Sequence, residues 1–307
     1  MYDGGKMLNN KEWELINIAA GKDNLHIGDD CAVWDEKNLV VTTDHMCENI
    51  HFDFSFMTPE SVGWRLMAAN ASDIISMGSK PTHFLLNIAV PSSEMEIAKK
   101  IISGIKSFAG KYNIKIMGGD TTGSQFFMVG ATMFGEKPEK PLLRSGAKPG
   151  DFVYISSPTG LSKCGLLHLQ YSTNGFELSK KKFLYPDPFE TVPSSFECMS
   201  SAIDISDSLI SELILLAKSS KVHIKIDLDK IPIEKEVEQT AKLFKMNVEE
   251  LVLGSGEEFS LIFTSDREIK QGYKIGRVYE TKEPEVEVFN KNGVFDLSRI
   301  AVFTHFG

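Results

Sequence analysis

The sequence is poor in the residues that mark several large classes of protein. It has four cysteines in 307 residues and no Cys-x-x-Cys pair, which argues against a disulfide framework and against a zinc site. No stretch approaches the roughly 20 apolar residues that a membrane-spanning helix needs, and residues 1–10 have no apolar signal-peptide core. These absences predict a cytoplasmic protein with reduced thiols and no membrane partner.

Basic residues are outnumbered by acidic ones. The chain has 33 Lys and Arg against 42 Asp and Glu, a formal net charge of −9. Because a negative surface repels phosphate backbones, we expect no nucleic-acid partner. The acidic excess does not exclude phosphate chemistry that is carried by metal ions.

Common catalytic motifs are absent too. The sequence contains no GxxxxGK[ST] loop, no HRD or DFG triplet, no GxGxxG after a strand and no GxSxG elbow. A P-loop enzyme, a protein kinase, a Rossmann dinucleotide-binding protein and an α/β-hydrolase are therefore excluded.

The segments that are present alternate between strand and helix, which predicts an α/β (α+β) chain. Apolar spacing predicts a helix over Pro59–Met77, with Thr58 as its cap. Proline, glycine and charge over Gly135–Gly150 indicate a linker. We place a boundary near residue 140, with domains at 1–138 and 139–307. A polar segment, Ser172–Lys182, is expected to be a surface loop. The other expected elements are helices at Glu12–Ala20, Glu94–Ala109 and Ser208–Ala217, and strands at Leu39–Thr43, His83–Ala89, Ile114–Met117, Phe126–Phe134, Phe152–Ser156, Val222–Asp227 and Ser260–Phe263.

Acidic residues recur at strand ends and beside glycines. Several carboxylates converging on one cleft repel each other unless cations are present, and magnesium binds a few carboxylates together with phosphate oxygens. The clusters are Gly28–Asp30, Thr42–Asp44, Ser72–Asp73, Gly118–Thr122, Asp204–Asp207 and Gly254–Glu258.

Each cluster also has a purely structural interpretation. Gly28–Asp30 alone is more typical of a turn, Thr42–Asp44 of a strand entering a loop, and Ser72–Asp73 of a polar helix face. Ser206 or Asp207 suits the N-cap of the following helix. The Gly118–Thr122 run is harder to dismiss, because two glycines allow close backbone approach.

Two further residues allow both a structural and a functional interpretation. His51 lies between apolar residues, where a lone histidine is usually structural. Arg144 is either a solvated linker charge or a phosphate clamp, since guanidinium binds phosphate oxygens in a fork.

Read in order, these segments resemble the thiamine-monophosphate kinase family of the aminoimidazole-ribonucleotide-synthetase-like superfamily. Singly the motifs are weak, but eight of them in order and at similar spacing make a specific pattern. They are Ile27–Val33, Thr42–Asp44 with His51-Phe52, Gly63-Trp64 with Ala69–Asp73, Met77–Pro81, Gly118–Thr122, Arg144–Asp151, Ala202–Asp207 and Gly256–Phe259.

The resemblance implies a two-domain fold of mixed sheets covered by helices, with an N-terminal metal- and ATP-binding domain that forms a dimeric barrel. The C-terminal domain would complete the nucleotide and substrate site. The implied reaction is Mg²⁺-dependent phosphorylation of thiamine phosphate by ATP to thiamine diphosphate in a homodimer. The implied magnesium ligands are Asp30, Thr42, Thr43, Asp44, Asp73, Asp120, Asp204 and Asp207. The implied nucleotide contacts are Gly119, Asp120, Arg144 and Ser206, and the implied thiamine phosphate contacts are His51, Glu257 and Phe303.

The sequence also departs from the family pattern. Ser208, Gly123 and Ser255 stand where the family usually has glycine, arginine and glycine. Two alternatives therefore remain: a related ATP-dependent synthetase, similar to aminoimidazole ribonucleotide synthetase, and a non-catalytic homologue that binds nucleotide or thiamine phosphate. In the kinase reaction the acceptor is a phosphate oxygen, already deprotonated near neutral pH, so we expect no general base.

Overall fold

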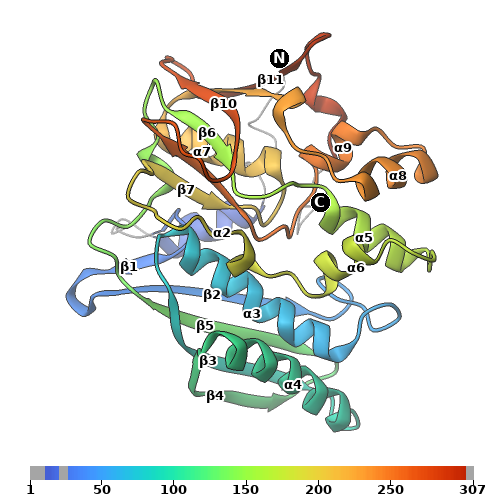
Figure 1. Ribbon diagram of the computed structural model, residues 1–307. Coiled ribbons are helices and arrows are strands. Elements are labelled where there is room, and N and C mark those ends of the chain that lie inside the picture. The colour runs from blue at the N-terminus through green and yellow to red at the C-terminus, as the bar shows by residue number, and fades with distance from the viewer. Residues whose placement is uncertain (1–10, 21–26, 302–307) are drawn as a thin grey trace.

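Two β-sheets, each with its own helices, make up the computed structural model, which describes residues 11–20 and 27–301 (Figure 1). A five-stranded sheet is built from residues 32–136 and a seven-stranded sheet from residues 152–294. Helix α2 (Lys11–Ala20) precedes both. Among the described helices, none combines the length and apolarity needed to cross a membrane.

The first sheet has the order β1-β2-β5-β3-β4, in which only β3 and β4 run parallel. Successive side chains of a strand face opposite sides, so Val40 and Thr42 are buried while Thr43 is exposed. Short β1 pairs only with residues 39–41 of β2. The strands are β1 (Ala32–Trp34), β2 (Leu39–Cys47), β3 (Pro81–Val90), β4 (Lys115–Gly123) and β5 (Met128–Glu136).

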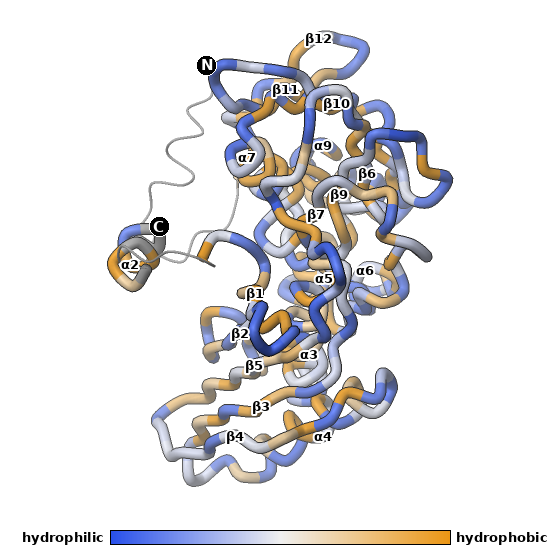
Figure 2. The backbone as a smooth tube through the Cα atoms, turned by 90° about the vertical axis from the view of Figure 1, so that its left-hand side faces the viewer, coloured by the Kyte–Doolittle hydropathy of each residue, from blue (hydrophilic) through white to orange (hydrophobic). Residues whose placement is uncertain are grey.

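Helices α3 (Pro59–Ser76) and α4 (Met95–Tyr112) cover one face of this sheet (Figures 1 and 2). The predicted start of α3 is confirmed, because Thr58 accepts a hydrogen bond from the Ser61 amide and Pro59 follows it. The two helices touch through glycines. A Cβ on Gly63 would lie 2.0 Å from the Ile101 carbonyl oxygen, and one on Gly104 would lie 1.9 Å from the Glu60 carbonyl oxygen.

The other face of the first sheet carries exposed side chains. Every residue of the edge strand β4 is exposed, including Ile116 and Met117. An exposed edge strand presents unpaired backbone N–H and C=O groups, and β4 also exposes these two apolar side chains.

The second sheet has the order β12-β11-β8-β10-β6-β9-β7, with β8 and β11 parallel. Its core is aliphatic, and α7 packs against it through Leu209, Ile210 and Leu213. The strands are β6 (Phe152–Ile155), β7 (Ser201–Asp204), β8 (His223–Asp227), β9 (Leu261–Ser265), β10 (Tyr273–Tyr279), β11 (Glu285–Asn290) and β12 (Gly293–Val294). The helices are α5 (Leu161–Gln170), α6 (Glu177–Leu184), α7 (Leu209–Ser220), α8 (Lys235–Phe244) and α9 (Val248–Leu253). Short 3-10 turns are η1 (Asp35–Lys37), η2 (Arg144–Gly146), η3 (Pro188–Thr191), η4 (Leu228–Lys230) and η5 (Leu297–Arg299).

Two sequence predictions are wrong in detail. The segment Ser172–Lys182 is not only a surface loop, because α6 begins at Glu177 and packs on α5, where a Cβ on Gly165 would lie 2.1 Å from the Ser179 carbonyl oxygen. The strand predicted to end at Met117 continues as β4 through the two glycines to Gly123. Gly119 is needed there, because a Cβ on it would lie 1.7 Å from the Leu86 carbonyl oxygen of β3.

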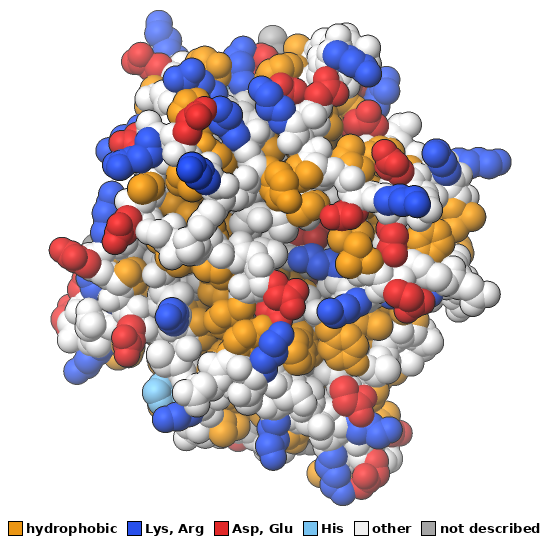
Figure 3. Space-filling view, in the orientation of Figure 1, with side chains coloured by type: hydrophobic (Ala, Val, Ile, Leu, Met, Phe, Trp, Pro, Cys, Tyr) orange, Lys and Arg blue, Asp and Glu red, His pale blue; other side chains and the backbone are white. Residues whose placement is uncertain are grey.

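The net negative charge forms no single acidic patch on the face drawn in Figure 3, where acidic and basic side chains are interspersed. The placement of carboxylates in the interior is therefore more informative than the bulk charge.

Candidate functional site: a buried carboxylate cluster

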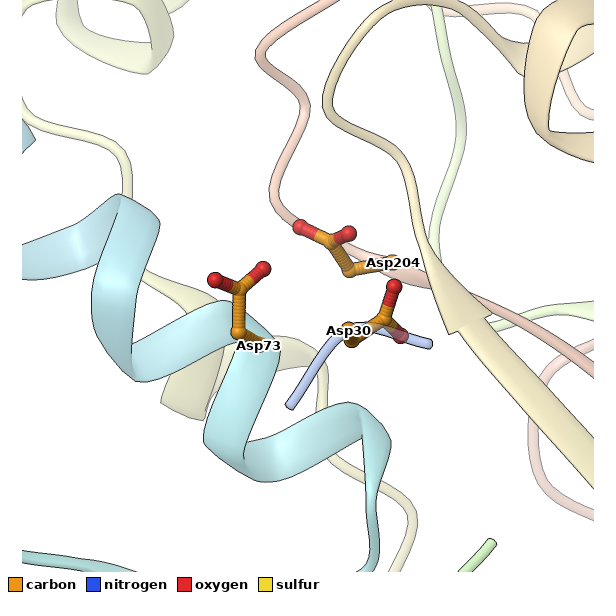
Figure 4. A group of neighbouring side chains, drawn as sticks. All are labelled: Asp30, Asp73 and Asp204. Atoms are coloured by element: carbon orange, nitrogen blue, oxygen red, sulfur yellow. The ribbon is translucent and has the colours of Figure 1, made fainter. Parts of the chain in front are cut away.

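Three aspartates from distant parts of the chain converge between the two sheets (Figure 4). Asp30 lies in the loop before β1, Asp73 in α3 and Asp204 at the end of β7. One carboxylate oxygen of each lies within 4.8 Å of the others. Asp30 and Asp204 are buried and Asp73 is half-buried. This is the donor set that a hard divalent cation prefers.

Helix α3 holds the cluster together, because two adjacent residues of this helix take part in it: Asp73 is one of the three aspartates, and Ser72 hydrogen-bonds to another. The hydroxyl of Thr42 on β2 donates to Oδ2 of Asp73 at 2.6 Å. The hydroxyl of Ser72 donates to Oδ2 of Asp204 at 2.7 Å. The Asn70 side chain, one turn earlier, accepts a hydrogen bond from the Asp44 amide at 3.2 Å. The helix thus joins β2 of the first sheet to β7 of the second.

Arg144 supplies the positive charge next to the cluster. Its Nε donates to Oδ1 of Asp30 at 2.9 Å, and its Nη2 contacts the same oxygen. Its amide donates to both carboxylate oxygens of Asp29 at 3.2 Å. The other oxygen of Asp30, Oδ2, is buried and has no hydrogen-bond partner among the described residues. A buried carboxylate oxygen without a donor is costly, so this atom favours a bound cation.

Burial and repulsion from neighbouring carboxylates raise the pKa values of Asp73, Asp204 and Asp44. Burial is the largest cause for Asp73, whose pKa lies well above 3.8, and repulsion from Asp44, Asp204 and Asp30 adds to it. Burial, then repulsion from Asp30, likewise raises the pKa of Asp204. Burial raises the pKa of Asp44 to about 6. A bound cation would stabilise the ionised form of these acids, because its charge offsets both the burial and the mutual repulsion.

The loop after β7 carries more carboxylates. Ser206 is half-buried and Asp207 is exposed, and Glu212 in the first turn of α7 accepts hydrogen bonds from the Asp207 amide at 3.2 Å and the Ser206 hydroxyl at 3.4 Å. Burial, then repulsion from Asp207, raises the pKa of Glu212.

The N-cap of α7 is Ser208, so the expectation of Ser206 or Asp207 is wrong. The Ser208 side chain accepts a hydrogen bond from the Ser211 amide at 3.1 Å. Its φ of −174° is extended backbone, which needs no glycine. The departure from the family pattern at this position is therefore accommodated by a capping hydrogen bond.

The Gly254–Glu258 turn closes over this loop. A Cβ on Gly256 would lie 2.2 Å from the Asp207 carbonyl oxygen, and the Glu257 amide donates to the Ser206 carbonyl oxygen at 2.5 Å. The Glu257 side chain forms an ion pair with Arg65 of α3. Ser255, another departure from the pattern, is buried and donates to Glu258 at 2.6 Å.

Other predicted site residues lie apart from the cluster. Thr43 faces the opposite side of the sheet from Thr42, and its hydroxyl donates to the Ala131 carbonyl oxygen at 3.1 Å. Asp120, on β4, and its neighbour Gly119 are exposed. In register, Asp44 stands opposite Ala131, then Leu86, then Gly119, as the strand order requires. Three strand spacings amount to about 14 Å, so Asp120 of the same chain lies at the far edge of the sheet.

The remaining two predicted residues concern the acceptor. His51 is half-buried, and its Nδ1 accepts a hydrogen bond from the Cys47 amide at 3.0 Å. Phe303 lies outside the described residues.

Sequence reasoning missed Arg65 and Glu212. A signal existed for each: Arg65 is a charge within the apolar face of a predicted helix, and Glu212 lies four residues after a capping serine, in the first helical turn. Both signals are common in ordinary helices, so neither identifies a site without the fold.

Comparisons with known proteins agree along most of the chain. A family model described as "AIR synthase related protein, N-terminal domain" matches residues 28–136. The thiamine-monophosphate kinase of Pyrococcus horikoshii is 35% identical over 266 residues, which cover 84% of this chain and 83% of that protein.

Solved structures match at the level of the whole chain. The structure of AaThiL complexed with AMPPCP and TMP has a TM-score of 0.86 and 28% identity, covering 98% of both chains. The crystal structure of thiamine monophosphate kinase from Aquifex aeolicus has a TM-score of 0.82 at 28% identity, covering 95% of this chain and 99% of that one.

Proposed function

The chain belongs to the thiamine-monophosphate kinase family, and we infer that it phosphorylates thiamine phosphate to thiamine diphosphate with ATP. The observation that carries this inference is the buried cluster of Asp30, Asp73 and Asp204, placed in a fold whose relative was solved with AMPPCP, an ATP analogue, and TMP. A cluster of acids beside one arginine suits a triphosphate that arrives with cations.

We propose that magnesium binds at the cluster. The ligands would be Asp30, Asp73 and Asp204, whose oxygens lie together, and Asp44, whose charge acts on Asp73. Thr42 lies close by through its hydrogen bond to Asp73. Thr43, Asp120 and Asp207 complete the proposed set, although in this chain they lie outside the three-aspartate group. When bound, magnesium would neutralise phosphate charge and orient the phosphoryl group.

The protein's own residues supply alignment rather than covalent chemistry. Two nitrogens of Arg144 contact the Asp30 carboxylate. A guanidinium in this position can bind phosphate oxygens when cations take over the neutralisation of that carboxylate. With Gly119, Asp120 and Ser206 it forms the proposed nucleotide contacts. Because the acceptor is already an anionic oxygen, direct in-line transfer needs no general base. A trapped phosphoryl-enzyme that passes its phosphoryl group to thiamine phosphate would overturn direct transfer.

The acceptor is proposed to bind at Glu257 and His51, with Phe303 beyond the described residues. Glu257 is linked by its amide to Ser206 of the nucleotide loop, so the acceptor and donor sites share a backbone contact. A carboxylate here suits thiamine phosphate, whose thiazolium ring carries a fixed positive charge.

We propose a homodimer in which the first sheets of two copies join as a barrel. Two observations support it: β4 is exposed along its whole length, and residues 42–47 of β2 extend beyond the short partner strand β1. Pairing β4 of one copy along that edge of the other would bring a second Asp120 toward the Asp44 side of the cluster.

The activity is tested by measuring ADP formation in Mg²⁺ with and without thiamine phosphate. We expect ADP only when thiamine phosphate is present, together with an equal amount of thiamine diphosphate. ADP formation that needs a different acceptor would favour a related synthetase, and binding without turnover would favour a non-catalytic homologue.

The shared site is tested by mixing two inactive variants, Asp73→Asn and Asp120→Asn, after subunit exchange. If each site uses Asp73 of one copy and Asp120 of the other, half of the dimers regain one of two sites, which gives about a quarter of wild-type activity. No recovery in a mixture that light scattering shows to contain dimers would place both residues in one chain's site.

A further inference from the structure

Arg65 is buried in the half of α3 that lies away from the carboxylate cluster. Its side chain is 0% exposed, and a fully buried arginine is rare unless it is paired. One nitrogen, Nη1, donates to the Phe183 main-chain carbonyl oxygen, and the guanidinium carbon lies 4.1 Å from the centroid of the Phe183 ring. The arginine is thereby fixed by two contacts before it meets its acidic partner.

That partner is Glu257, whose Oε1 contacts Nη2 of Arg65. The contact is an ion pair rather than a well-aligned hydrogen bond, because neither Nη2 nor Nε has a hydrogen-bond partner among the described residues. The Glu257 side chain remains 35% exposed. The carboxylate is thus held from behind by a buried cation and stays accessible to a ligand in front.

The backbone of Glu257 is constrained as well. Its φ is +53°, a left-handed conformation that non-glycine residues seldom adopt. Neighbouring Gly256 packs against the Asp207 carbonyl oxygen, which leaves no room for the turn to relax. Left-handed residues held by their surroundings often occur at functional sites.

These contacts connect Glu257 to the carboxylate cluster by two routes. One is the hydrogen bond from its amide to Ser206. The other is α3 itself, since Arg65 and Asp73 are eight residues apart, or about 12 Å along the helix axis. A rigid helix of this length fixes the separation between the Glu257 carboxylate and the proposed metal site.

We propose that Arg65 is a positioning residue that holds the Glu257 carboxylate at a set distance from the metal cluster, where it receives the cationic ring of the phosphoryl acceptor. The proposal rests on the proposed function. It assigns to α3 two tasks, one in each half: Asp73 belongs to the donor side of the transfer and Arg65 to the acceptor side.

The variant Arg65→Lys separates the positioning of Glu257 from the charge that it faces. Arg65→Lys keeps the charge but cannot contact Glu257, the Phe183 carbonyl and the Phe183 ring together. We expect kcat/KM for thiamine phosphate to fall about tenfold while KM for MgATP changes less than about twofold. The matched control is Arg267→Lys, an exposed arginine paired with Asp266, which should behave as wild type.

A double-mutant cycle with Glu257→Gln makes the test specific. If Arg65 acts through Glu257, adding Arg65→Lys to Glu257→Gln should lower kcat/KM less than about twofold further. Additive losses, an equal rise in KM for MgATP, or unchanged kinetics in folded Arg65→Lys would each overturn the proposal.

Two further comparisons distinguish a failure of the Arg65 proposal from misfolding of the variant and from failure of the proposed function. If Arg65→Lys does not fold, Phe183→Leu loosens the same guanidinium while keeping its charge and the carbonyl, and it should show the same non-additivity with Glu257→Gln. An inactive wild type would refute the proposed function itself. Active wild type and control with a normal Arg65→Lys would refute only the role of Arg65.

Discussion

The two halves of helix α3 bury charge in opposite ways. At Arg65 the charge is matched, because a buried guanidinium meets a carboxylate, a carbonyl and a ring face. At Asp73 it is unmatched, because burial and three neighbouring acids raise its pKa. Buried groups of one sign are stable only with added cations or protons, whereas the charge of the Arg65 guanidinium is compensated by a carboxylate of the same chain. This difference supports the two proposed roles: a metal site at the Asp73 end of α3 and the positioning of Glu257 at the Arg65 end.

The strongest way to break this comparison is to neutralise the unmatched end. Asp73→Asn removes one of the repelling charges while retaining an oxygen that can accept from Thr42. We expect kcat to fall at least about a hundredfold, while the metal-free protein becomes more stable. Thermal unfolding with and without Mg²⁺ checks this, since the Mg²⁺-induced rise in Tm should shrink. The control is exposed Asp266→Asn; a destabilised metal-free Asp73→Asn protein would contradict the argument.

A second way is to displace the helix that carries both ends. Gly63→Ala places a Cβ where the Ile101 carbonyl oxygen of α4 would lie 2.0 Å away, so α3 must shift. We expect a loss of about 1–3 kcal/mol in the free energy of unfolding, and lower activity because both ends move.

Gly110→Ala on α4 is the matched control, because a Cβ added there would have nothing within 4 Å and alanine favours the helix. Urea titration of both variants measures the difference. Equal stability of the two would mean that the glycine contact does not fix the position of α3.

How much of this site the sequence could predict follows from the range of each interaction. Thr58 and Pro59 identify the start of α3 because capping is a local rule. Asp30, Asp73 and Asp204 were each recognisable as acids in a suggestive setting, but their convergence depends on the packing of α3 between two sheets. The pairing of Arg65 with Glu257 joins residues 192 positions apart by sequence number, and no local pattern marks it.

Strand register explains what could not be predicted about Asp120. The sequence predicts a strand that ends at Met117, before the two glycines, and instead the glycines continue β4 at the exposed edge. Because Gly119 packs directly on the Leu86 carbonyl, the glycine serves close strand packing in this chain. In the proposed homodimer the Asp120 that meets the nucleotide would come from the second chain, and no pattern within one chain specifies that contact.

A third, smaller effect is the pH dependence of the stability that Mg²⁺ adds, which tests whether the charge at the Asp73 end is unmatched. The pKa of Asp44 and that of Asp29 are raised to about 6, each from 3.8, mainly by burial. Between pH about 4 and about 6 the folded metal-free state therefore holds more protons than the unfolded state, so its stability falls as the pH rises across this range and the loss is complete above it. Magnesium bound at the proposed site would relieve this loss, so the Mg²⁺-induced rise in Tm should be larger at pH 7.5 than at pH 5, by about 2 °C if the difference is about 1 kcal/mol. A shift that does not change with pH would contradict an unmatched cluster.

The smallest effect concerns the loop after β7, which links the two ends of α3. The loop contacts Glu257 through Ser206, and Asp204 at its start belongs to the carboxylate cluster. Ser208 ends this loop as the N-cap of α7. Ser208→Ala removes the capping acceptor and should cost about 1 kcal/mol in the free energy of unfolding, whereas Ser208→Gly should cost only about 0.3 kcal/mol. Neither change removes a group from the carboxylate cluster, so kcat should stay within about twofold of wild type in both. If Ser208→Gly instead raised kcat many-fold, the serine would be restraining the loop as well as capping the helix, and the loop would belong with the unmatched, ligand-dependent end of α3.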